Sequence, residues 1–259
     1  MIKTANKPFN VIRALCLAVF CLSMIGCVTQ TTGNEVDRKA ALDTHYRLAL
    51  AYLDNRNRDS ARHHIQKIFE LDDDSAKGLA AQAVLFQLEG EAELAEDRFK
   101  QALKEDPGFS QARNNYAAFL YQRERYEDAF EQFEIVSRDL DYDQRARALL
   151  SLGRTAQKLE RDERAKAAFE HAYNLDPNIA PVLVELAFIS FQNEDYAKAK
   201  EYLDQYSRVA QQSARTLLLG IKIERIFGNK DKEASYAMAL KNRFPYSEEY
   251  LEYKREMSQ

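Results

Sequence analysis

The sequence predicts an all-α fold, a solenoid of about six helix-turn-helix repeats with a right-handed superhelical twist. An alanine followed four residues later by a large apolar residue recurs at intervals of about 34 residues. Glycine and proline are scarce, at 8 and 5 of 259 residues, as expected for a chain that is nearly all helix. The recurring pairs are Ala61/Ile65, Ala95/Phe99, Ala129/Phe133, Ala165/Phe169 and Ala199/Leu203. A run of unrelated amphipathic helices would not keep this phase.

A second small residue stands twelve residues before each of these alanines and predicts close packing of two helices within each repeat. These residues are Ala49, Ala83, Ala117, Gly153 and Ala187. Pro107 and Pro177 follow Ala102 and Ala172 by five residues, which fits a helix that ends beside a proline before the next helix begins.

These offsets resemble the tetratricopeptide repeat, a helix pair of about 34 residues. We expect repeats at 42–75, 76–109, 110–143, 146–179 and 180–212, and a less regular sixth at 213–248. The whole array then covers 42–248, between a predicted tether at 27–41 and a predicted C-terminal tail at 249–259. The resemblance implies that the first helix of each repeat lines the partner-binding face.

The charge balance argues against nucleic-acid binding. The formal net charge is -4, and no cluster of lysine and arginine is large enough to neutralise a phosphate backbone. The three cysteines, Cys16, Cys21 and Cys27, all lie in the first 27 residues, so none remains downstream to form a disulfide. Helix packing alone must therefore stabilise the array.

The first 26 residues have the pattern of an export signal. Lys3, Lys7 and Arg13 precede an apolar stretch at 14–25, which is shorter than the about 20 residues that a bilayer-spanning helix needs. The segment from Met24 to Cys27 resembles the bacterial lipobox, although Met24 replaces the usual leucine. An ordinary signal peptide, with Cys27 as an incidental thiol, is the alternative.

The lipobox resemblance implies that the Cys27 thiol is acylated with chains such as palmitate and becomes the N-terminus after cleavage at residue 26. One acyl chain anchors a protein only marginally, whereas two or three hold it firmly. Lipoproteins kept at the inner membrane commonly carry aspartate after the cysteine, and here that residue is Val28. We therefore expect delivery to the outer membrane, with the protein on its periplasmic face and a short polar tether after Val28.

The chain shows no convincing catalytic or metal-binding motif. No glycine-rich phosphate loop, nucleophile elbow or His-Glu-x-x-His run occurs in the sequence. His63 and His64 are adjacent and point about 100° apart on a helix, so we expect solvated histidines rather than a metal site. Asp72–Asp74 lack the pattern of a calcium loop, and we expect them to cap the following helix. We expect no enzyme activity and no cofactor beyond the lipid on Cys27.

The positions that line the binding face of tetratricopeptide arrays are apolar at the N-terminal end of this chain. The candidate partner contacts are Tyr46, Leu50, Leu53, Val84 and Leu88. The corresponding positions of repeat four are basic, and those of repeat five are again apolar: Arg147, Arg154 and Lys158, then Val184, Phe188 and Phe191. An exposed apolar face indicates a partner site. The alternative for each residue is packing against the adjacent repeat, and for each cation a solvated surface.

Two stretches resemble the PilF/PilW family of type IV pilus biogenesis lipoproteins beyond the generic repeat. Asn114–Tyr121 with Arg125–Ala129 resembles their third repeat, and Ala214–Ile221 with Phe244–Pro245 resembles their sixth. Members of that family are pilotins, which bind the secretin of the pilus and promote its localisation and multimerisation in the outer membrane. The resemblance therefore implies a secretin subunit as the partner, bound by repeats one and two. A lipoprotein adaptor for cell-wall synthesis or barrel assembly, and a periplasmic enzyme, are the competing hypotheses.

Overall fold

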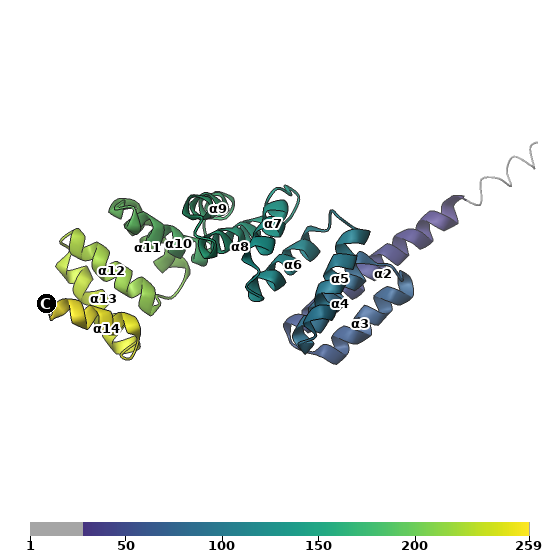
Figure 1. Ribbon diagram of the computed structural model, residues 1–259, viewed down its shortest axis with the longest axis horizontal. Coiled ribbons are helices and arrows are strands. Elements are labelled where there is room, and N and C mark those ends of the chain that lie inside the picture. Colours follow the sequence, from purple (N-terminus) through teal and green to yellow (C-terminus); the bar gives the residue numbers. More distant parts are fainter. Residues whose placement is uncertain (1–27, 259) are drawn as a thin grey trace, which may run out of the picture. The chain divides into compact units, whose positions relative to one another are not determined.

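The computed structural model describes residues 28–258, and over that range the chain forms thirteen helices and no strand (Figure 1). The helices are α2 (Val28–Asp54), α3 (Arg58–Leu71), α4 (Ala76–Glu89), α5 (Ala92–Glu105), α6 (Ser110–Gln122), α7 (Tyr126–Ser137), α8 (Arg145–Lys158), α9 (Asp162–Leu175), α10 (Ala180–Gln192), α11 (Tyr196–Val209), α12 (Ala214–Ile226), α13 (Lys230–Arg243) and α14 (Glu248–Met257). The chain divides into two compact units, Met1–Gly108 and Phe109–Gln259. Helices α2 to α5 belong to unit 1, and α6 to α14 belong to unit 2.

Each predicted repeat is a pair of consecutive helices in contact, from α2 with α3 to α12 with α13. The recurring alanines are completely buried between these helices. They are Ala49, Ala61, Ala83, Ala95, Ala117, Ala129, Ala165, Ala187 and Ala199. The large residue four positions after the second alanine is buried with them, as Phe99 and Phe169 show at 0% exposure. The helical-repeat prediction is therefore confirmed.

Gly153 shows why one position of each pair must be small. A Cβ atom added to Gly153 of α8 would lie 2.5 Å from Cε1 of Phe169 on α9, which is closer than two carbon atoms can approach. Gly220 of α12 lies in the same relation to Tyr236 of α13, with 2.9 Å from the added Cβ to Cε2. The irregular sixth repeat thus uses the same close approach as the fourth.

The turn between the two helices of a repeat contains a residue in the left-handed region. In repeats two and six this residue is glycine, Gly90 with φ of 87° and Gly228 with φ of 71°. In the other four repeats it carries a side chain at φ between 55° and 60°: Arg56, Glu124, Glu160 and Glu194. The left-handed conformation costs a residue with a Cβ atom about 1–2 kcal/mol.

The helix ends agree with one sequence expectation and correct another. Helices α5 and α9 end two residues before Pro107 and Pro177, as predicted. The expectation that the aspartate run caps α4 is wrong, because α4 begins after Ser75, whose hydroxyl accepts from the backbone N–H of Gly78. Asp72 instead closes α3, where its N–H donates to the carbonyl of Ile68 at 2.8 Å.

The two flanking segments are helical where the structure describes them. Helix α2 begins at Val28, so the segment predicted as a polar tether is helical from that residue onward. The predicted C-terminal tail forms α14, which packs on α12. Lys222 of α12 pairs with Glu252 and Glu256 of α14 at 2.5 and 3.2 Å. None of the helices within residues 28–258 is both long and apolar enough to cross a membrane.

Candidate functional site

The predicted N-terminal face, Tyr46, Leu50, Leu53, Val84 and Leu88, lies on α2 and α4, which are in contact within unit 1. The structure buries Tyr46 and Leu53, which keep only 7% and 3% of their exposure. These two were expected to contact a partner, and the structure instead places them in the core of unit 1. Leu50 and Val84 are half-buried and Leu88 is 38% exposed, so these three form the accessible part of the face.

An ion pair joins the first helices of repeats one and two beside this face. The Lys77 ammonium of α4 pairs with the Asp43 carboxylate of α2. The same ammonium lies 5.9 Å from the ring centroid of Tyr46, within reach of a cation–π interaction. The charges of Lys77 and Asp43 neutralise each other, so this pair adds no net positive charge beside the apolar side chains of the N-terminal face.

Two histidines meet across the helix pair of repeat one, a contact that the sequence analysis missed. Nδ1 of His45 on α2 lies 2.9 Å from Nδ1 of His64 on α3, and the Tyr52 ring stacks on His64 with 5.4 Å between centroids. Burial, followed by the charges of His45 and His63, lowers the pKa of His64. Of the two histidines expected to be solvated, His63 is exposed, whereas His64 is half-buried against His45. His45 and His64 are 19 positions apart in the sequence, and only the packing of α2 on α3 brings them together. The spacing of adjacent residues such as His63 and His64 could not reveal this contact.

The second set of predicted contacts lies on α10 in unit 2. Val184, Phe188 and Phe191 are half-buried against the core of repeats five and six. The guanidinium carbon of Arg215 on α12 lies 3.8 Å from the centroid of the Phe188 ring, and Phe191 makes an edge contact with Tyr196 at 5.3 Å. All three side chains keep part of their surface accessible, as the prediction requires.

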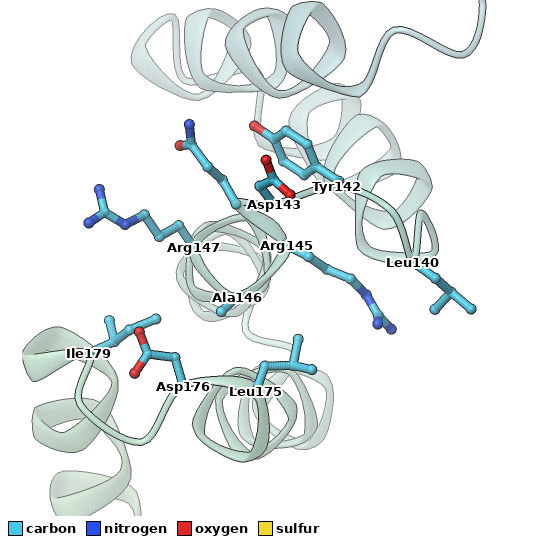
Figure 2. A pocket seen from close by; sticks show the side chains of 10 residues that line it. Leu140, Tyr142, Asp143, Arg145, Ala146, Arg147, Leu175, Asp176 and Ile179 are labelled. Carbon is cyan, nitrogen blue, oxygen red and sulfur yellow. The ribbon is translucent and has the colours of Figure 1, made fainter.

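A cleft of about 610 Å³ opens elsewhere in unit 2, between the segment before α8 and the turn from α9 to α10 (Figure 2). Arg145 and Arg147 leave α8 in opposite directions, and Asp176 and Ile179 lie across from them (Figure 2). Burial, helped by the Asp139 carboxylate, raises the pKa of Tyr142 at this cleft to about 12. Its hydroxyl donates a hydrogen bond to Oε1 of Gln111 at 3.3 Å. Tyr142 therefore stays protonated and has a structural role rather than a role in proton transfer.

Within residues 28–258 no group of three or more histidine, cysteine, aspartate and glutamate side chains is placed to hold a metal ion. Cys27, the predicted lipid attachment site, and the predicted signal segment 1–26 lie outside the described residues.

Models of a family described as "Tetratricopeptide repeat" match this chain at residues 42–75, 87–153 and 146–179. The first and last of these ranges coincide with the expected first and fourth repeats. The chain is also 34% identical over 249 residues to the Type IV pilus assembly protein PilF of Pseudomonas aeruginosa, covering 95% of this chain and 99% of that protein.

Two solved structures share both the fold and sequence similarity with this chain. The structure of PilF from Pseudomonas aeruginosa is 35% identical with a TM-score of 0.79, covering 85% of this chain and 99% of that one. The structure of PilW, described as a widely conserved type IV pilus biogenesis factor, is 27% identical with a TM-score of 0.65, covering 81% of this chain and 96% of that one. Since the similarity to PilF extends over nearly the whole of both sequences, the protein belongs to the PilF/PilW family of tetratricopeptide-repeat proteins.

Proposed function

We propose that the protein is an outer-membrane lipoprotein that binds the secretin subunit of a type IV pilus and promotes secretin localisation and multimerisation. Family membership supports the pilus, because the relatives are named for pilus assembly and biogenesis. The observation that carries the binding role is the accessible remainder of the N-terminal face. Leu50, Val84 and Leu88 stay partly open on two adjoining first helices, while the rest of that face is packed into the core.

An apolar strip of this kind binds an apolar segment of a partner as a helix or an extended chain laid along it. In the proposed mechanism the N-terminal face covers such a segment of the secretin subunit. Without this contact the apolar segment would be exposed to water. The lipid on Cys27 then carries the complex through lipoprotein sorting to the outer membrane. Confinement of several complexes at one membrane surface raises the effective concentration of secretin subunits and favours ring assembly.

Cross-linking in living cells tests the partner directly. A photo-reactive residue is placed at Leu88 on α4, and as a matched control at Leu94 on α5, which is a comparably exposed leucine of the same unit at 47%. We expect the secretin subunit to be captured from position 88 and not from position 94. Capture of a cell-wall synthase or a barrel-assembly subunit from position 88 would instead establish the competing adaptor function.

The lipid-carriage step has its own test. A Cys27→Ala variant is expected to fold and still bind secretin subunits, but to leave them away from the outer membrane as monomers. The measurement is the amount of secretin multimer in separated membranes. Normal rings in the outer membrane of cells that carry this variant would rule out carriage by the lipid.

A further inference from the structure

Six residues of unit 2 form a surface with a chemistry that the N-terminal face lacks. They are Arg147, Arg154 and Lys158 on α8, Phe188 and Phe191 on α10, and Arg215 on α12. We propose that these residues, here named the arginine–phenylalanine patch, bind an acidic segment of a partner protein that also carries aromatic or aliphatic side chains. This site is separate from the proposed secretin face and does not depend on it.

Contacts around Glu185 join the three helices that contribute to the patch. The guanidinium of Arg215 lies 3.7 Å from one carboxylate oxygen of Glu185, and that of Arg154 lies 4.0 Å from the other. Both distances exceed a hydrogen bond, so neither arginine satisfies its donors on Glu185. The side chain of Arg154 is 46% exposed and that of Arg215 is 50% exposed, whereas the side chain of Glu185 is only 11% exposed. Donors from both arginines are therefore available to a second carboxylate from solution.

The basic part of the patch runs along one side of α8. Arg154 and Lys158 follow Arg147 by seven and eleven residues, which places all three on the same helix face. All three are exposed, and within the described residues neither Arg147 nor Lys158 makes an ion pair. Arg154 and Arg215 share one carboxylate, Glu185, so cations outnumber carboxylates at that point. Arg147 also lines the cleft that holds Asp143 and Asp176. Charge complementarity therefore selects an acidic partner.

The phenylalanines of α10 add apolar side chains beside Arg215. Phe188 is held under the guanidinium of Arg215, which leaves both groups with a fixed orientation and little entropy to lose on binding. Phe191, one turn further along α10, is also half-buried. Rigid aromatic side chains beside arginine are the residues that contribute most to protein interfaces. An acidic segment that also carries an apolar side chain can use both parts of the patch.

The chain itself contains one example of this kind of recognition. On α12, Lys222 binds Glu252 and Glu256 of α14, and Arg225 contacts Glu256 at 3.1 Å. Tyr250 and Tyr253 of α14 pack against the apolar core beneath. An acidic and aromatic helix thus covers basic residues on a first helix of unit 2. The arginine–phenylalanine patch offers matching chemistry without such a covering helix among the described residues.

Fluorescence anisotropy of a labelled peptide tests the proposal. The probe is Glu-Glu-Phe-Leu-Glu-Phe-Glu-Glu, and its control carries lysine at every glutamate position. The full chain is purified in an uncharged detergent. We expect the acidic peptide to bind, its lysine counterpart not to bind, and the affinity to fall as salt rises from about 50 to about 300 mM.

Two triple variants with the same change in net charge locate the site. Arg147→Gln with Arg154→Gln and Lys158→Gln is expected to weaken peptide binding about tenfold or more, since it removes three of the four cations. Arg208→Gln with Lys230→Gln and Lys241→Gln removes three exposed cations from second helices of unit 2 and is expected to change binding less than about twofold. Circular dichroism checks that both variants keep the helical content.

Three outcomes would overturn the proposal. One is equal binding of the two peptides, and another is equal weakening by the two triple variants. The third is that the α8 triple variant loses binding to phosphatidylglycerol vesicles, or loses self-association measured by sedimentation, while the acidic peptide does not bind even the unmodified chain. That result would assign the patch to a membrane surface or to a second copy of the chain.

Discussion

The N-terminal face and the arginine–phenylalanine patch use corresponding repeat positions for opposite chemistry. In unit 1 the accessible side chains are Leu50, Val84 and Leu88, and the neighbouring Lys77 is neutralised by Asp43. In unit 2 the accessible side chains include Arg215 over Phe188, and Arg215 and Arg154 share the single carboxylate of Glu185. The repeat therefore fixes where a side chain is placed, while the residue chosen at each position fixes what it binds. One chain can in this way serve two partners of different character.

The largest expected effect is a loss of secretin binding at the N-terminal face while peptide binding at the arginine–phenylalanine patch is unchanged. A Leu50→Asp and Val84→Asp double variant should weaken secretin binding about a hundredfold, because it places two charges in an apolar contact. Binding of the acidic peptide to unit 2 should not change. Surface-immobilised secretin subunits and the labelled peptide measure the two affinities on the same protein. Loss of both affinities in a protein that remains folded would mean that the faces act as one site.

The second prediction concerns the packing that supports the patch. Gly153→Ala should destabilise unit 2 by about 1–3 kcal/mol, since the added methyl group would overlap the Phe169 ring. Gly108→Ala is the matched control, because the nearest atom to its added Cβ is 3.4 Å away and its φ is not positive. Chemical denaturation followed by circular dichroism measures both changes. If the two variants have equal stability, the close approach of α8 and α9 does not require a glycine.

The third prediction exploits the turns between paired helices. Glu124→Gly or Glu160→Gly should stabilise the chain by about 0.5–1 kcal/mol, because each removes a Cβ atom from a left-handed residue. The converse change, Gly90→Ala, should destabilise it by a similar amount. Thermal melts of the three variants check the signs. A destabilised Glu124→Gly variant would show that the glutamate side chain stabilises the turn by more than its strained backbone costs.

The smallest expected effect is a pH dependence of the stability of unit 1, which contains His64. Because the pKa of His64 is lowered in the folded state, the unfolded chain binds more protons as pH falls below the ordinary histidine value of about 6.5. The free energy of unfolding of unit 1 should therefore be highest at neutral pH and decline as the pH falls below about 6.5. His45→Gln removes one of the charges that lower this pKa and should flatten the decline. Melting temperatures between about pH 7.5 and pH 5.5 provide the measurement, and a decline of the same slope in both proteins would exclude the histidine pair.

Periodicity predicted the architecture because the same packing requirement recurs in every repeat. The buried alanines, Phe99, Phe169 and the prolines after α5 and α9 all lie where their spacing places them. The binding face was predicted less well, since position within a repeat does not say how deeply a side chain is buried. Tyr46 and Leu53 occupy the same kind of position as Leu88, yet neighbouring helices cover only the first two.

Contacts between residues far apart in sequence were missed for a related reason. The pair of His45 and His64 depends on the angle between α2 and α3, and the sharing of Glu185 by two arginines depends on three helices at once. No local spacing encodes these distances. Ser75 caps α4, and the preceding aspartates do not, because the helix begins at Ala76. Sequence patterns do not fix the first residue of a helix to within one position.

Helix α14 restricts how such a chain can evolve in length. It contacts α12, and its glutamates are bound to Lys222 and Arg225 of that helix. A copied helix pair added after residue 258 would find the stacking surface of repeat six already occupied. Lengthening by gene duplication would therefore succeed more readily among repeats three to five of unit 2, where each pair contacts its immediate neighbours.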